Sequence, residues 1–150
     1  MQARIRQLYG PFQRKQVKSA VYGQLKPYKI SLISGLLESF MNEKKPFLFP
    51  GYSMQDLAIG IGIPAWQIST FLNRQKRMHF NEFVNHYRIW HCEELIQQGF
   101  VFDLDIEALA RLCGFTGRGT FGNAFKKYTG FTPSRYRRGW ERLFRSEINE

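Results

Sequence analysis

The sequence has little of what secreted or membrane-embedded proteins need. Its 150 residues include two cysteines, Cys92 and Cys113, which are too few for a disulfide scaffold and are typical of a reducing compartment. No apolar run reaches the 18 residues of a membrane-spanning helix, and residues 1–30 lack the apolar core of a signal peptide. Apolar residues make up 43% and aromatic residues 16% of the chain, so we expect a folded, cytoplasmic protein.

Patterns that carry enzyme chemistry are also missing. The three histidines and two cysteines do not have the spacing of a zinc site. Glu93 and Glu94 are neighbours in a predicted helix, so their carboxylates diverge and cannot act as a catalytic pair. The glycine-rich stretch from Gly114 to Gly122 lacks the Walker lysine and a preceding strand. We therefore predict no enzyme activity, no catalytic residue, no metal and no cofactor.

Acidic residues are scarce where basic residues gather. The formal net charge is +10, which favours a polyanionic partner, although an ordinary solubilising charge stays open as the alternative. The charge is uneven, because residues 1–30 carry +7, residues 31–100 carry 0 and residues 101–150 carry +3. Two stretches, Pro64 to Met78 and Thr116 to Thr129, contain no acidic residue. This local pattern points to nucleic acid more strongly than the total charge does.

Helical periodicity and capping signals predict an all-α chain. Ser31 is a plausible N-cap of a first helix that ends at Asn42, and Ser53 with Asp56 resembles a capping box. The longest predicted helix, Phe80 to Gln98, has a length of about 28 Å at about 1.5 Å per residue. A helix that opens at Ser53 is predicted to end at Gly62, and the next begins at Pro64. A helix from Ile106 to Cys113 is followed by one that ends at Gly130. Thr132-Pro133 begins a further helix, and the segment from Trp140 to Ile148 continues as a short amphipathic helix.

An internal repeat pairs two of these helical units. Leu57-Ala58 followed by Gly62 recurs as Leu109-Ala110 followed by Gly114, at an offset of 52 residues. In both units alanine permits a close approach of the second helix, and glycine tolerates the positive φ of a sharp turn. Two short helices with such a turn, the second helix cationic, are the ingredients of a DNA-reading helix-turn-helix. The apolar residues of the second helices recur as well, at an offset of 53: Ile68 and Leu72, then Phe121 and Phe125.

The second unit resembles the AraC family of transcription regulators, and the first unit resembles it too. The matching residues of the second unit are Ile106, Ala110, Gly114, Phe115, Phe121, Phe125, Lys126, Gly130, Thr132, Pro133, Tyr136 and Arg137. Those of the first unit are Leu57, Ala58, Gly62, Ile68, Leu72, Phe80, Phe83, Asn85, Arg88, Leu95 and Ile96. The likeness covers about residues 31–138 and is greatest to the subgroup common in Bacteroidetes-type bacteria.

The resemblance implies a pair of homeodomain-like helix-turn-helix subdomains joined by a long central helix. We predict a basic N-terminal tail or linker (1–30), a first helix-turn-helix subdomain (31–79), a linker helix (80–99), a second helix-turn-helix subdomain (100–138) and a C-terminal helical extension (139–150). In some members of the subgroup the domain lies on the cytoplasmic side of a multi-span membrane sensor. An upstream sensor region missing from this chain is therefore one expectation.

The function implied by the resemblance is sequence-specific DNA binding by a nucleoid-associated transcription regulator. Its partners would be double-stranded DNA, RNA polymerase and, on DNA, a second copy of the chain. The implied base contacts are Ala65, Trp66, Ser69, Thr70 and Asn73 in the first unit, and Arg118, Gly119, Gly122 and Asn123 in the second. The candidate phosphate contacts are Arg74, Lys76, Arg77, Lys126, Lys127 and Arg135.

Several positions depart from the family pattern or have a second interpretation. Gly122 and Asn123 replace the usual Ser-Arg of the second reading helix, and Arg77 replaces a glycine in the turn before Phe80. Cys92 stands where the family has alanine, which favours a core thiol over a nucleophile. Trp66 suits a thymine methyl or a sugar, but packing against a neighbouring aromatic ring stays open. Two other functions remain: a non-specific or architectural nucleic-acid binder, and a helical protein-interaction module.

Overall fold

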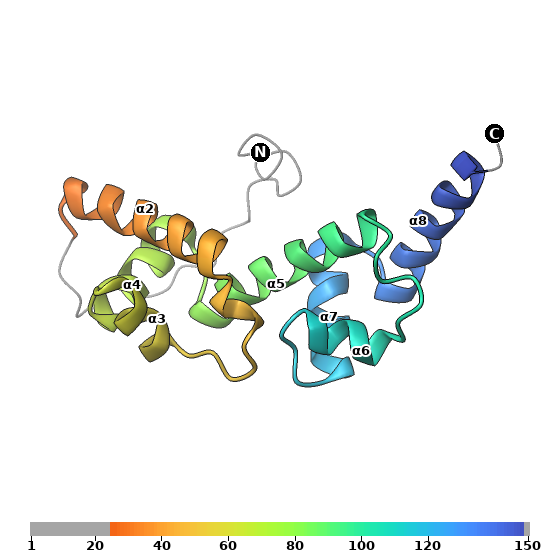
Figure 1. Ribbon diagram of the computed structural model, residues 1–150. Coiled ribbons are helices and arrows are strands. Elements are labelled where there is room, and N and C mark those ends of the chain that lie inside the picture. Colours follow the sequence, from red (N-terminus) through yellow and green to blue (C-terminus); the bar gives the residue numbers. More distant parts are fainter. Residues whose placement is uncertain (1–24, 149–150) are drawn as a thin grey trace.

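The computed structural model describes residues 25–148, and within this part of the chain the regular structure is entirely helical. Figure 1 shows two groups of helices at the two ends of one long helix, α5 (Phe80–Gln97). The first group contains α2 (Pro27–Lys44), the short turn η1 (Pro46–Leu48), α3 (Met54–Ile61), α4 (Ala65–Phe71) and the π-helical turn η2 (Leu72–Lys76). The second contains α6 (Ile106–Leu112), α7 (Arg118–Thr129) and α8 (Pro133–Ile148). The predicted all-α fold with a long central helix is confirmed.

Each group has its own hydrophobic core, and α5 contributes to both. Its N-terminal half buries Phe83 and Val84 against α2, α3 and α4. Its C-terminal half buries Ile89, Cys92 and Ile96 against the second group. At about 1.5 Å per residue, the 18 residues of α5 span about 27 Å. Because α5 lies in both cores, its length sets the distance between the two groups.

The two sharp turns of the repeat have the geometry that the sequence predicts. Gly62 ends α3 at a φ of 68°, and Gly114 follows α6 at a φ of 84°, a conformation in which glycine avoids the steric cost of a side chain. The capping box of Ser53 and Asp56 is present, and the Asp105 carboxylate caps α6 by accepting from the Ala108 N–H at 2.7 Å. Local signals therefore fix both helix-turn-helix units.

Two helix boundaries differ from those predicted. The first helix begins at Pro27 and not at Ser31, because proline at the first helical position is already set for the helix and loses no hydrogen bond there. Pro64 lies just outside α4 and is its N-cap. The helix begun by Pro133 continues without a break to Ile148, so it includes most of the helical extension predicted over 139–150. Most of the predicted tail over 1–30 lies outside the described residues.

Candidate nucleic-acid interface

The first candidate reading helix, α4, has a buried side and an outward side. Ile68 and Phe71 lie in the core, whereas Trp66 on the other side is 46% exposed. Ala65 and Ser69 are half-buried, and Asn73, the second residue of η2, is exposed. The Asn73 side-chain amide donates to the Ser69 hydroxyl at 3.3 Å. This side of α4 therefore offers one large indole and a small polar pair to a partner.

Thr70 does not belong to the outward side. It is only 5% exposed, and its hydroxyl donates to the Trp66 carbonyl one turn earlier at 2.8 Å. The prediction that Thr70 is an outer-face residue is therefore wrong. A threonine in a helix often bonds to the carbonyl four residues back, and that bond occupies the donor that a base would need.

The second candidate reading helix, α7, buries Phe121, Ala124 and Phe125 and exposes Arg118 and Asn123. The ring of Phe121 packs on Phe125 at a centroid distance of 5.5 Å, which keeps the opposite side turned outward.

Two glycines on α7 leave its outward side open. A Cβ atom added at Gly119 or at Gly122 would meet nothing within 4 Å, so no packing requirement within the described protein explains either glycine. A helix surface without side chains lets another molecule approach the backbone closely.

Most of the candidate phosphate contacts are exposed cations at the ends of the reading helices. Arg74, Lys76 and Arg77 follow α4, and Lys126 lies in the last turn of α7. Arg135 stacks on the exposed ring of Phe131, with 5.2 Å from its guanidinium carbon to the ring centroid. A cation held on an aromatic face keeps its outer N–H groups available for an anion.

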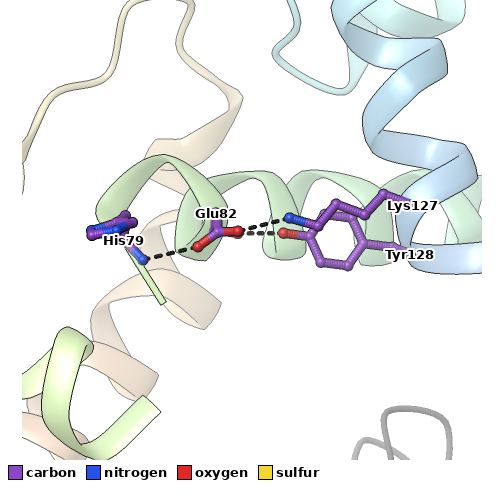
Figure 2. A network of polar contacts seen from close by, with 4 residues as sticks. All are labelled: His79, Glu82, Lys127 and Tyr128. Carbon is purple, nitrogen blue, oxygen red and sulfur yellow. Dashed lines mark hydrogen bonds and ion pairs between the residues drawn. The ribbon is translucent and has the colours of Figure 1, made fainter. Parts of the chain in front are cut away.

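Lys127 is engaged elsewhere, as Figure 2 shows. Its ammonium lies 2.7 Å from the Glu82 carboxylate near the start of α5, and the Tyr128 hydroxyl donates to the Glu82 backbone carbonyl at 3.0 Å. The other carboxylate oxygen of Glu82 accepts from the His79 backbone N–H at 3.1 Å. The bond from Lys127, followed by that from His79, lowers the pKa of Glu82. The prediction that Lys127 contacts phosphate conflicts with this pairing, which ties the end of α7 to the start of α5.

A second tie, which the sequence did not reveal, lies at the middle of α5. Arg88 donates through Nε to the Phe47 carbonyl at 2.7 Å and through one terminal nitrogen to the Phe49 carbonyl at 3.2 Å. Its guanidinium also lies over the Phe115 ring, at 5.4 Å from the centroid. Arg88 therefore links the η1 turn of the first group to the turn of the second. It matches the family pattern, but nothing in the pattern shows which carbonyls 39 and 41 residues away it binds.

Gly114 is required at this junction for two reasons. Its φ is positive, and a Cβ atom there would lie 2.5 Å from the Phe47 carbonyl oxygen and 2.9 Å from the Leu48 Cα. The backbones of the two helix-turn-helix groups thus meet at a point where only glycine fits. The glycine predicted for its turn also permits the contact between the groups.

The thiols are packed in the second core, and the environment of His86 disfavours its charged form. Cys92 and Cys113 are both buried, as predicted for Cys92, and a hydrogen bond with the Cys113 thiol, followed by burial, raises the pKa of Cys92. Burial, followed by the charge of Lys76, lowers the pKa of His86. Among residues 25–148 no three His, Cys, Asp or Glu side chains gather as a metal site would require. In the same range, no helix is long and apolar enough to cross a membrane.

Comparison with known proteins gives one family and one fold. A helix-turn-helix domain model matches residues 57–139. An uncharacterised HTH-type transcriptional regulator of Escherichia coli strain K12, YijO, is 34% identical over 71 residues, which cover 47% of this chain and 24% of that protein. This chain therefore matches only about a quarter of the length of that curated relative.

Solved structures share the fold at lower identity. The C-terminal domain of AraT, a response regulator from Geobacillus stearothermophilus, has a TM-score of 0.58 at 20% identity, over 78% of this chain and 88% of that one. A transcriptional regulator from Chromobacterium violaceum, described as an AraC-type DNA-binding domain-containing protein, has a TM-score of 0.55 at 19% identity. That alignment covers 73% of this chain and 89% of the other.

Proposed function

This chain belongs to the AraC-type helix-turn-helix family, and from that premise we propose that it is a sequence-specific transcription regulator whose α4 and α7 enter adjacent major grooves. The family is one of proteins that bind double-stranded DNA, and its members are not enzymes. A monomer of this design reads an asymmetric site with both units. Successive major grooves on one face of the duplex lie about 34 Å apart.

One observation carries the proposal: each reading helix has its apolar side in a core and its other side exposed, and both cores include the same rigid helix. Trp66 and Asn73 on one unit and Arg118 and Asn123 on the other are accessible to a partner. Three features limit how far the units can move relative to each other: the α5 helix of about 27 Å, the Arg88 hydrogen bonds and the Glu82–Lys127 ion pair. Two exposed helices held at a fixed separation suit a repeating target such as duplex DNA.

We assign roles to the outward residues by their chemistry. Arg118 is the first candidate for guanine, since a guanidinium bridges the O6 and N7 acceptors. Asn73 and Asn123 suit adenine, and Trp66 with Ala65 suits a thymine methyl group. Ser69 is a further base contact, and Gly119 and Gly122 permit a close backbone approach. The phosphate contacts are Arg74, Lys76, Arg77, Lys126 and Arg135, without Lys127.

Partners beyond DNA follow from the role of a regulator. We propose RNA polymerase as the complex on which the bound protein acts, and a homodimer when two sites lie in tandem. A sensory region upstream of this chain would supply the signal, consistent with a relative of which this chain matches 24%. The compartment we propose is the cytoplasm, at the nucleoid.

The test is selection of bound duplexes from a random DNA pool, followed by affinity measurements on the selected sequence. We expect a two-part site with one part per major groove. Arg118→Ala should relax the preference at one base pair and cost about 1–3 kcal/mol on the selected sequence. Lys126→Ala should weaken selected and random duplexes by the same factor, because a phosphate contact carries no sequence information. A pool that yields no enriched sequence would contradict the proposal.

The glycine-rich side of α7 favours one alternative, a non-specific or architectural binder. Without side chains at positions 119 and 122 the second unit has fewer groups that could read bases. Competition with random DNA at fixed salt separates the two functions. A specific regulator should prefer its selected site by about a thousandfold or more, and an architectural protein should show little preference.

A further inference from the structure

The last helix, α8, has one face that is fully used by contacts with the body. The Tyr136 ring packs on Phe125 at 5.4 Å, and its hydroxyl accepts from the Gln97 side chain at 3.0 Å. The next residue, Arg137, donates to the Leu104 carbonyl and pairs with Glu141 at 3.4 Å. Phe144 packs on Phe102 at 5.2 Å. These contacts settle which side of α8 faces the cores.

The opposite face of α8 carries a row of arginines. Arg135, Arg138, Arg142 and Arg145 follow one another at intervals of three, four and three residues, which places all four on one side of a helix. All four are exposed. Glu141 belongs to the body side, where it pairs with Arg137, so it does not neutralise the row. We call these four residues the arginine stripe.

We propose that the arginine stripe binds the phosphate backbone of duplex DNA beyond the segment read by α7. The proposal rests on the proposed function, because it uses the DNA that α4 and α7 position. Its first member, Arg135, lies six residues after the end of α7, so the stripe starts beside the second reading helix. Figure 1 shows the C-terminal end of α8 projecting away from the helices around α5.

The dimensions and composition of the stripe favour a regular polyanion over an acidic protein surface. From Arg135 to Arg145 the helix rises about 15 Å, and one DNA strand carries about four phosphates over that length of axis. Guanidinium groups bind phosphate oxygens in a bidentate manner. Among the residues whose side chains the structure describes, two large exposed apolar residues lie near the stripe, Leu143 on α8 and Phe131 under Arg135, and they are not neighbours, whereas protein interfaces are usually anchored by clusters of apolar groups.

The experiment compares a double variant, Arg138→Gln with Arg142→Gln, with the unaltered chain on its selected duplex at several salt concentrations. The plot of log affinity against log salt should lose about 1.8 of its slope, at about 0.9 for each lost phosphate contact. At 0.15 M salt this corresponds to roughly a 30-fold loss of affinity. Base preference should not change. Ethylation of phosphates flanking the α7 segment should weaken the unaltered chain and not the variant.

The matched control removes two positive charges from the ends of α2, as Lys26→Gln with Lys44→Gln, where both lysines are exposed. This variant should keep the slope of the unaltered chain. An equal change in both variants, or no change in the α8 variant, would overturn the proposal. An unaltered chain that selects no sequence would instead contradict the proposed function. A stripe that binds an acidic protein would leave DNA binding intact in the α8 variant.

Discussion

Arg77 holds a backbone conformation that residues other than glycine adopt at a cost. It closes η2 at a φ of 56° and a ψ of 37°, in the left-handed region. The family usually has glycine in this turn, and the structure shows the physical reason for that preference. An arginine here pays about 1 kcal/mol of steric strain, and it adds a cation at the end of the first reading helix.

Stability and DNA affinity should therefore respond to Arg77→Gly in opposite directions. We expect the free energy of unfolding to rise by about 0.5 kcal/mol, since relief of strain exceeds the greater chain entropy of glycine. The salt slope of DNA binding should fall by about 1 with the lost phosphate contact. Denaturant unfolding and a salt titration measure the two effects. Arg77→Gln is the control, which should lose the affinity without gaining stability.

Single residues also mark where sequence reasoning reaches its limit. The cap at Ser53 could be predicted because its partner, Asp56, lies three residues away. The pairing of Lys127 with Glu82 could not, because it joins positions 45 residues apart that only the packing of α7 on α5 brings together. Thr70, a base contact implied by the family resemblance, is buried, and its hydroxyl donates to the Trp66 carbonyl of its own helix.

Among the helices, α7 combines a weak local preference for helix with a fixed position. Its glycines at 119 and 122 each cost about 1 kcal/mol of helix stability relative to alanine. The cost is offset by the burial of Phe121 and Phe125 in the second core. If the glycines serve packing within the protein, a methyl group should be harmful there, but the space around both positions is open.

Gly122→Ala should then stabilise the protein by about 0.5–1 kcal/mol and still weaken DNA binding, because the added methyl group blocks the close approach of the backbone to the duplex. Thermal unfolding and affinity for the selected site measure the two outcomes. Gly35→Ala on α2, where a Cβ atom also meets nothing within 4 Å, is the control. It should give the same gain in stability with unchanged affinity. Unchanged affinity of the Gly122 variant would show that its backbone does not approach DNA.

The sequence predicted which helices form better than it predicted the residues at which they begin and end. Glycine breaks, caps and apolar spacing located both helix-turn-helix units and α5, because these signals act within a few residues. The start of α2 at Pro27 was not predicted, because Ser31 was the capping residue that the sequence offered. Proline at the first helical position is already set for the helix, so α2 begins there without a capping side chain.

For the molecule as a whole, the relative placement of the two units is the property on which two-groove reading depends. A shared helix alone permits rotation of each unit about its own contacts. The Arg88 bonds to the Phe47 and Phe49 carbonyls, the close approach at Gly114, and the Glu82–Lys127 pair restrict that rotation. Of these, the Glu82–Lys127 pair is partly exposed and contributes a few tenths of a kcal/mol at most. Arg88 is half-buried and satisfies two carbonyls, so it should matter more.

Arg88→Met keeps an apolar stem on Phe115 but removes both hydrogen bonds, and we expect it to cost about 1–3 kcal/mol of stability while both units remain folded. Its larger effect should be on spacing. One base pair inserted between the two halves of the selected site turns one half by about 34° relative to the other. The unaltered chain should lose most of its affinity for that duplex. The variant should discriminate less between the two spacings, because its units can rotate to follow the DNA.

The measurement is the ratio of affinities for the normal and the lengthened site, in the unaltered chain and in Arg88→Met. Lys127→Met removes the weaker interaction, the ion pair with Glu82. It serves as a comparison and should change the ratio less than Arg88→Met does. Base preference within each half-site should be the same in all three proteins, since no reading residue is altered. An unchanged ratio in Arg88→Met would mean that α5 and the Gly114 contact are sufficient to hold the units. A lost preference within one half-site would mean that Arg88 supports a single unit and not their spacing.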